Sequence, residues 1–147
     1  MAGSTGGFVP PRVRSVYQKA LDRQRELQVL WQAGRGPHPA LGPRIYNEQP
    51  ALAQLYTMLG RLNKPLAKNR SKGLPLTETN NLHLVRKTAF IYGDEDAVCP
   101  TQVIETVAAE TPGSMAYCIP HTGHSTYFER ADMFNRTALD FLKSCYA

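Results

Sequence analysis

The hydrophobic positions of this 147-residue sequence follow two different patterns. In the N-terminal half they recur every three or four residues, which is typical of helices with one apolar face. In the C-terminal half, two short and nearly continuous apolar runs flank one helical stretch. The pattern therefore predicts a helical first half followed by a unit in which strands and helices alternate.

Two helices are expected in the first half. The first begins at Val13 and ends at Gly34, because glycine commonly terminates a helix. The second begins near Pro50. The residues between them, 34–46, are rich in proline and glycine and predict a loop, in which His38 is expected to face water. The apolar positions of the two helices are Val13, Val16, Tyr17, Ala20, Leu21, Leu27, Leu30, Trp31, Leu52, Leu55, Tyr56, Leu59 and Leu62.

The second half predicts a strand over 82–92, a helix over 101–109, a strand over 115–119 and a last helix over 131–144. A strand, helix and strand in succession imply parallel pairing with a right-handed crossover. Both strands then end at the same edge of the sheet. The residues of the last helix that are expected to face the sheet are Met133, Phe134, Thr137, Ala138, Phe141 and Leu142.

Acids follow the first strand and histidines follow the second. Asp94, Glu95 and Asp96 come directly after Gly93, and the loop after residue 119 holds two histidines in the run His121-Thr122-Gly123-His124. Parallel strands bring these two loops together at one edge. A carboxylate beside a histidine is an acid–base pair that would serve a nucleophile.

Residues 85–147 resemble the C-terminal end of the α/β-hydrolases. The similarity lies in a strand, a Gly-x-x-Asp loop, a helix, a second strand, a Gly-His pair and a final helix. It implies that Asp96 is the acid of a catalytic triad, because the family places its acid three residues after the glycine, and that His124 is the base. Asp94 and Glu95 are rival acids. His121 is a rival base that is more consistent with shaping its loop.

The resemblance implies an α/β fold class, specifically a partial α/β-hydrolase fold with parallel strands, flanking helices and a helical, lid-like N-terminal half. Residues 1–12 would be a nucleophile-elbow remnant or flexible N-terminus, 13–81 the lid-like region and 82–147 the C-terminal part of the core. A whole domain of this kind needs roughly 200–250 residues. The chain is therefore interpreted as a truncated or heavily reduced member.

The segment Ala2-Gly3-Ser4-Thr5-Gly6-Gly7 resembles the nucleophile elbow Gly-x-Ser-x-Gly-Gly, which needs small residues around a strained turn. By this resemblance Ser4 is the nucleophile, and the Thr5 N–H forms part of the oxyanion hole. Two alternatives remain open. The segment could be an ordinary flexible Gly/Ser terminus, or residues 1–3 could correspond to the positions directly after the nucleophile in the family.

By resemblance, the helices of the lid-like region would cover the substrate pocket. Trp31, Tyr56 and Met58 within them would suit a small-molecule substrate with an apolar acyl or aromatic group. The same three residues would fit equally well into a hydrophobic core.

Composition narrows the function classes. Residues 1–87 carry 14 Lys/Arg and 4 Asp/Glu, and residues 88–147 carry 3 and 8, so the net charges are +10 and −5. With no dense basic run, the basic half is interpreted as a solvated helical surface and not as a nucleic-acid site.

No apolar run approaches the roughly 20 residues of a membrane span. Three scattered cysteines fit reduced thiols in the cytoplasm, and no metal or cofactor motif is expected.

Two hypotheses follow for function. The first is an esterase-like serine hydrolase that cleaves an ester, thioester or related acyl bond through Ser4, Asp96 and His124. The alternative is a non-catalytic fragment of the fold, which lacks a working nucleophile and binds a small molecule at most. An incomplete sheet would also expose an unpaired edge, from which we expect self-association.

Overall fold

The computed structural model of the chain describes residues 5, 7–62, 84 and 87–146. A parallel pair of strands, β1 (Thr88–Gly93) and β2 (Ser114–Ile119), is connected through the helix α4 (Thr101–Ala109). The register pairs Thr88 with Ser114 and Gly93 with Ile119. The predicted strand–helix–strand unit and its parallel pairing are thus confirmed. The other helices are η1 (Pro11–Val13), α1 (Arg14–Gln32), α2 (Ile45–Glu48), α3 (Pro50–Leu62), α5 (Thr126–Glu129) and α6 (Ala131–Tyr146).

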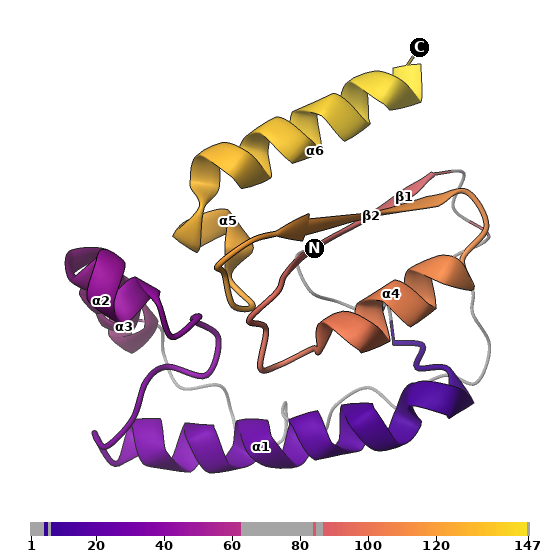
Figure 1. Cartoon of the computed structure of the whole chain (residues 1–147). Coiled ribbons are helices and arrows are strands. Elements are labelled where there is room, and N and C mark those ends of the chain that lie inside the picture. Colours follow the sequence, from indigo (N-terminus) through magenta and orange to yellow (C-terminus); the bar gives the residue numbers. More distant parts are fainter. Residues whose placement is uncertain (1–4, 6, 63–83, 85–86, 147) are drawn as a thin grey trace.

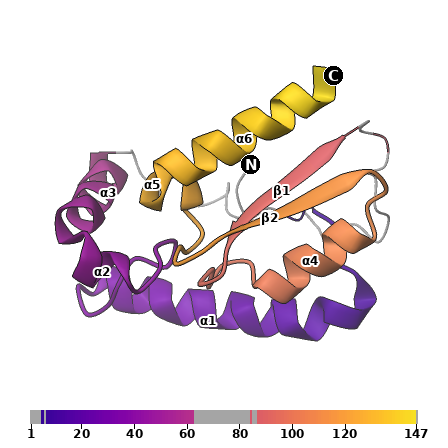
Figure 2. The same cartoon turned by 45° about the horizontal axis from the view of Figure 1, so that its top comes forward.

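The sheet lies between helices on both faces. Figure 1 shows α6 on one face, and α4 on the other with α1 running beneath it. The turned view in Figure 2 shows that α2 and α3 lie beyond the carboxyl ends of the strands, on the same side as α5. This arrangement is a partial α/β fold. It places the loops that follow both strands next to the helical N-terminal half.

The main hydrophobic core fills the space between the sheet and α4. Apolar side chains of α4 are fully buried there because its inner face follows the expected helical spacing. Val16 and Tyr17 of α1 pack against this core from outside, so the apolar face of the first helix contributes to packing. The buried members are Phe8, Val9, Val13, Phe90, Tyr92, Cys99, Val103, Ile104, Val107 and Ala108.

A second, smaller core joins α2 and α3. Leu41, Ile45 and Ala53 are buried in it. The helix α2 was not expected, since its sequence adjoins a stretch of glycine and proline that predicts a loop. In the part of the chain that the structure describes, no helix combines the length and apolar character that crossing a bilayer requires.

Two expectations about elements need correction. The predicted strand over 82–92 is too long, because β1 begins at Thr88 and Leu84 is 75% exposed outside it. The prediction that Met133 and Leu142 face the sheet is also wrong, since they are 40% and 50% exposed. A sheet of two strands is narrower than the apolar face of α6, and only part of that face, including Phe134 and Phe141, is partly covered.

Candidate active site

Asp96 and His124 form a hydrogen-bonded pair at the carboxyl edge of the sheet. The imidazole Nδ1 of His124 lies 2.9 Å from Oδ2 of Asp96. The other carboxylate oxygen, Oδ1, accepts the backbone N–H groups of Val98 at 2.7 Å and Cys99 at 2.9 Å. The Asp96 side chain is completely buried, whereas that of His124 is 29% exposed. The buried carboxylate thus has three hydrogen-bond partners, and the His124 side chain remains partly accessible.

Gly93 allows the two loops to approach closely. A Cβ at this position would lie 2.1 Å from the carbonyl oxygen of Thr122 and 2.4 Å from that of Gly123, so no side chain fits there. The Glu95 N–H donates to the Thr122 carbonyl at 3.0 Å, which fastens the acid loop to the histidine loop. The glycine that ends the first strand is therefore needed for this backbone contact.

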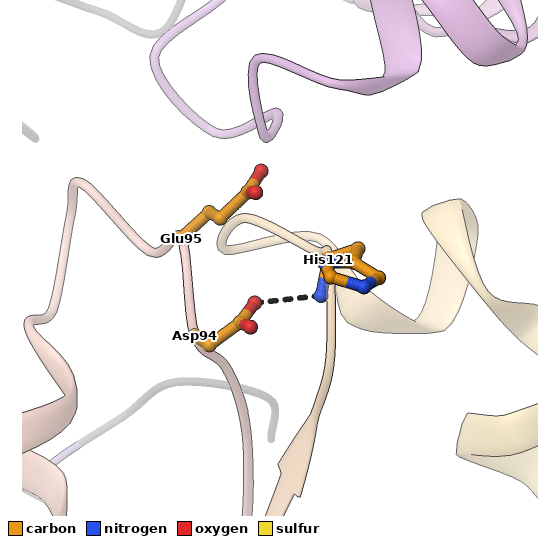
Figure 3. A group of neighbouring side chains, drawn as sticks. All are labelled: Asp94, Glu95 and His121. Atoms are coloured by element: carbon orange, nitrogen blue, oxygen red, sulfur yellow. Dashed lines mark hydrogen bonds between the residues drawn. The ribbon is translucent and has the colours of Figure 1, made fainter.

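The rival acids Asp94 and Glu95 form hydrogen bonds that stabilise these loops, and the rival base His121 lies at a turn of the histidine loop. Asp94 Oδ1 accepts the backbone N–H groups of His121 at 2.7 Å and Thr122 at 3.4 Å, and the first of these bonds is drawn in Figure 3. His121 has a φ of 60°, as a residue at a sharp turn does. Glu95 Oε1 accepts the guanidinium Nε–H of Arg44 at 2.7 Å. The side chains of Asp94, Glu95 and His121 offer ligand-type atoms within 4.8 Å of one another, but both acids already have hydrogen-bond partners.

The helical half of the chain contacts the histidine loop directly. The Ser125 N–H donates to the Ala40 carbonyl at 3.0 Å. The side-chain hydroxyls of Ser125 and Tyr56 lie 2.7 Å apart, which connects α3 to the residue after His124. Ser125 is only 1% exposed, so this contact lies inside the molecule.

His38 is half-buried, and its ring has partners that its loop did not predict. Its ring lies edge-on between Trp31 and Tyr56, with centroid distances of 4.5 Å and 4.9 Å. Its Nδ1 accepts the Ala40 N–H at 3.1 Å, and burial lowers its pKa. Tyr56 in turn contacts Phe128 edge-on at 4.9 Å. The expectation of a solvent-facing side chain missed these partners because they come from helices on both sides of the loop.

The three expected substrate residues lie in the helical half. Trp31 and Tyr56 flank the ring of His38. Met58 is 55% exposed and lines an open groove of about 360 Å³, and Trp31 lines a neighbouring groove of about 210 Å³. Neither groove is lined by Asp96 or His124.

The expected nucleophile, Ser4, lies outside the described residues. Thr5 is described and is 6% exposed, and its carbonyl accepts the Phe8 N–H at 3.2 Å. The roles of Ser4 as nucleophile and of the Thr5 N–H in an oxyanion hole therefore stay predictions.

Glu129 is a site residue for which the sequence predicted no role. It ends α5, it is only 4% exposed, and its carboxylate accepts backbone N–H groups from Gly42 and Gly123. The only signal in the sequence was its position inside the histidine motif. Gly42 lies 87 residues away, and no local pattern indicates that contact.

The path of the chain identifies the fold. A parallel sheet flanked by helices, with an acid and a histidine on the loops that follow its two strands, is part of the α/β-hydrolase fold. Solved structures follow a similar path of the chain.

A thermophilic esterase from Thermogutta terrifontis matches with a TM-score of 0.59 and 16% identity, over 93% of this chain and 52% of that protein. MGS-M2, an α/β hydrolase enzyme from a Medee basin deep-sea metagenome library, matches with a TM-score of 0.66 and 14% identity, over 97% of this chain and 54% of that protein. Among curated proteins, the uncharacterized hydrolase YugF of Bacillus subtilis is 31% identical over 67 residues, 45% of this chain and 24% of YugF. No family model matches the sequence. The chain thus spans about half the length of the solved structures that it resembles.

Proposed function

We propose that the chain is a serine hydrolase of the α/β-hydrolase class, which cleaves an ester, thioester or related acyl bond. The observation that carries the proposal is the hydrogen bond between His124 and Asp96. Hydrolases of this fold supply the precedent, since an esterase and an α/β hydrolase enzyme share the arrangement of the chain.

The hydrogen bond fixes the tautomer of the base. An ionised carboxylate only accepts hydrogen bonds, so the proton of a neutral His124 lies on Nδ1, facing Asp96. The lone pair of Nε2 is then free to receive the proton of a hydroxyl. When it does, the buried carboxylate stabilises the imidazolium. The 29% exposure of the His124 side chain leaves room for a reacting group at its outer edge.

We propose Ser4 as the nucleophile. Its hydroxyl oxygen would attack the acyl carbon while His124 takes the hydroxyl proton, and the Thr5 N–H would stabilise the resulting oxyanion. The tetrahedral intermediate would expel the leaving alcohol or thiol, which receives the proton from His124. Water would then hydrolyse the acyl-serine by the same route and restore the free hydroxyl.

Trp31, Tyr56 and Met58 are the proposed contacts for an apolar acyl or aromatic group of a small substrate. Tyr56 supports this best, because its hydroxyl contacts the residue next to His124. Met58 and Trp31 each line a groove of the helical half.

Labelling with a fluorophosphonate probe, followed by mapping of the modified peptide, tests the proposal. We expect the label on Ser4 and its loss in His124→Ala. Ser15→Ala, an exposed serine of α1, is the matched control and should label like the wild type. A folded protein that takes no label would contradict the proposal and favour the alternative, an acid–base pair without a nucleophile in this chain.

A further inference from the structure

Two backbone N–H groups from distant segments converge on the carboxylate of Glu129. Oε1 accepts the N–H of Gly123 at 3.0 Å, directly before His124. Oε2 accepts the N–H of Gly42 at 2.9 Å, from the segment Ala40–Gly42 that leads into α2. Since Glu129 is 4% exposed, this bridge is shielded from water.

The two bridged segments touch backbone to backbone. A Cβ on Gly123 would lie 2.4 Å from the nitrogen of Gly42, and a Cβ on Gly42 would lie 2.9 Å from the nitrogen of Gly123. The hydrogen bond from Ser125 to the Ala40 carbonyl lies in the same contact. His124 is therefore flanked on both sides by residues that are fixed to segment 40–42.

An ionised carboxylate satisfies both amides best. It offers acceptors on both oxygens and has no donor. A side-chain amide would turn its NH₂ donor toward one of the N–H groups and leave that buried N–H without a partner. A protonated carboxyl would offer one of the two N–H groups only its hydroxyl oxygen, a weaker acceptor. Charge-assisted bonds are also stronger than neutral ones.

We propose that Glu129 is a positioning residue for His124: its ionised carboxylate fastens the histidine loop to segment 40–42 and thereby holds the imidazole against Asp96. The inference rests on the proposed function only in treating this imidazole as the catalytic base. The positioning itself concerns contacts within the chain.

The surroundings make this bridge sensitive to acid. Burial, and after it the negative charge of Glu95, raises the pKa of Glu129. The two carboxylates lie near each other beside Gly42. A Cβ added to Gly42 would lie 3.0 Å from Oε2 of Glu95 and 3.1 Å from Oε2 of Glu129. Burial, and after it the negative charge of Glu129 among other groups, raises the pKa of Tyr46 and of Tyr56. The cations Arg44 and Arg130 are already paired, with Glu95 and Glu48 respectively.

A titration of the wild-type protein, followed by ¹⁵N NMR, tests the bridge without any substitution. The amide shifts of Gly42 and Gly123 should change together, with one shared midpoint above 4.5, the ordinary pKa of a glutamate. The amides of Val98 and Cys99, which donate to Asp96, serve as the internal control and should not share that midpoint. Separate midpoints for Gly42 and Gly123, or no change in either, would overturn the proposal.

Glu129→Gln tests the effect on His124. The downfield proton resonance of the His124 Nδ1–H, assigned by its loss in His124→Ala, should broaden or vanish in this variant. Labelling by the fluorophosphonate should slow by about 10- to 100-fold, as expected when a base is displaced. Glu26→Gln, at an exposed carboxylate of α1, is the matched control and should change neither.

The outcomes separate the two proposals. A Glu129→Gln variant with a sharp His124 resonance and wild-type labelling would overturn the positioning role. A wild-type protein that does not react with the probe contradicts the proposed function, while the resonance and the two glycine amides still test the positioning. If Glu129→Gln fails to fold, the wild-type titration decides.

Discussion

The hydroxyl of Tyr56 in α3 lies 2.7 Å from that of Ser125, the residue that follows His124. This bond ties a helix of the N-terminal half to the histidine loop, across 69 positions of sequence. Either hydroxyl can be the donor, and Ser125 is buried, so loss of one partner leaves a polar group without water.

Tyr56→Phe should destabilise the protein by about 1 kcal/mol, the usual loss when a buried hydroxyl loses its partner. The ring contacts with His38 and Phe128 would remain, so packing contributes little to the change. Urea unfolding at neutral pH measures the difference. Tyr146→Phe, at a side chain that is 91% exposed, is the control and should be neutral. Equal stability of the two variants would contradict the role of the bond.

Asp96→Asn should strongly reduce any hydrolase activity while the fold remains. An asparagine that keeps its oxygen toward the amides of Val98 and Cys99 turns its NH₂ group toward His124. Nδ1 must then accept a hydrogen bond, so the proton moves to Nε2 and the ring cannot act as a base. We expect a loss of about 10³–10⁴ in the rate of fluorophosphonate labelling.

Asp94→Asn is the matched control for that experiment. Its side-chain oxygen can still accept the His121 N–H, and the acid loop keeps its shape. Labelling should stay within about twofold of the wild type, a change of under half a kcal/mol in the barrier. A large loss in Asp94→Asn with little loss in Asp96→Asn would reverse the assignment of the acid.

The sequence was sufficient to predict the half of the site that depends on strand order. Parallel strands with a helix between them end at one edge, so the acid loop after Gly93 and the histidine loop after Ile119 could be expected together from periodicity and spacing. The hydrogen bond between Asp96 and His124 follows from that topology. The family resemblance then selected Asp96 from three adjacent acids, which the spacing alone could not do.

The contacts of His38, Glu129 and the last helix depend on tertiary packing, which no local sequence pattern predicts. His38 lies in a loop of glycine and proline, yet its partners Trp31 and Tyr56 come from the helices before and after it. Glu129 accepts the Gly42 N–H only because Gly42 and Gly123 allow segment 40–42 and the histidine loop to approach closely. Met133 and Leu142 follow helical spacing as a core residue would, but the two-stranded sheet does not reach them.

Gly93→Ala should destabilise the protein by about 3 kcal/mol or more, because the added methyl would overlap two backbone oxygens that cannot turn aside. The loops after β1 and β2 would have to separate, so labelling by the fluorophosphonate should fall as well. Chemical unfolding measures the first effect.

Gly60→Ala is the opposite case and serves as the control for Gly93→Ala. Gly60 lies inside α3, and apart from its chain neighbours and the backbone of its own helix no atom of the described residues comes within 4 Å of the added carbon, so alanine should stabilise the helix by up to about 1 kcal/mol. Similar stabilities for the two variants would contradict the close loop contact at Gly93.

The raised pKa of Glu129 predicts how stability depends on pH. Between the ordinary pKa of 4.5 and the raised value, the folded protein binds more protons than the unfolded chain, so the free energy of unfolding decreases as pH rises through this interval. One such group changes it by at most about 1.4 kcal/mol per pH unit. Urea unfolding of the wild type and Glu129→Gln, compared from about pH 4 to pH 7, isolates this slope.

The wild type should therefore lose stability relative to Glu129→Gln as pH rises, whereas Glu26→Gln should run parallel to the wild type. The reverse sign would mean that the amides of Gly42 and Gly123 outweigh burial and hold the pKa below its ordinary value. Positioning and stability oppose each other at this residue. The ionised form of Glu129 accepts both amides beside His124, and it is also the form that burial disfavours. His124 is therefore positioned best at a pH where Glu129 is ionised and contributes less to stability.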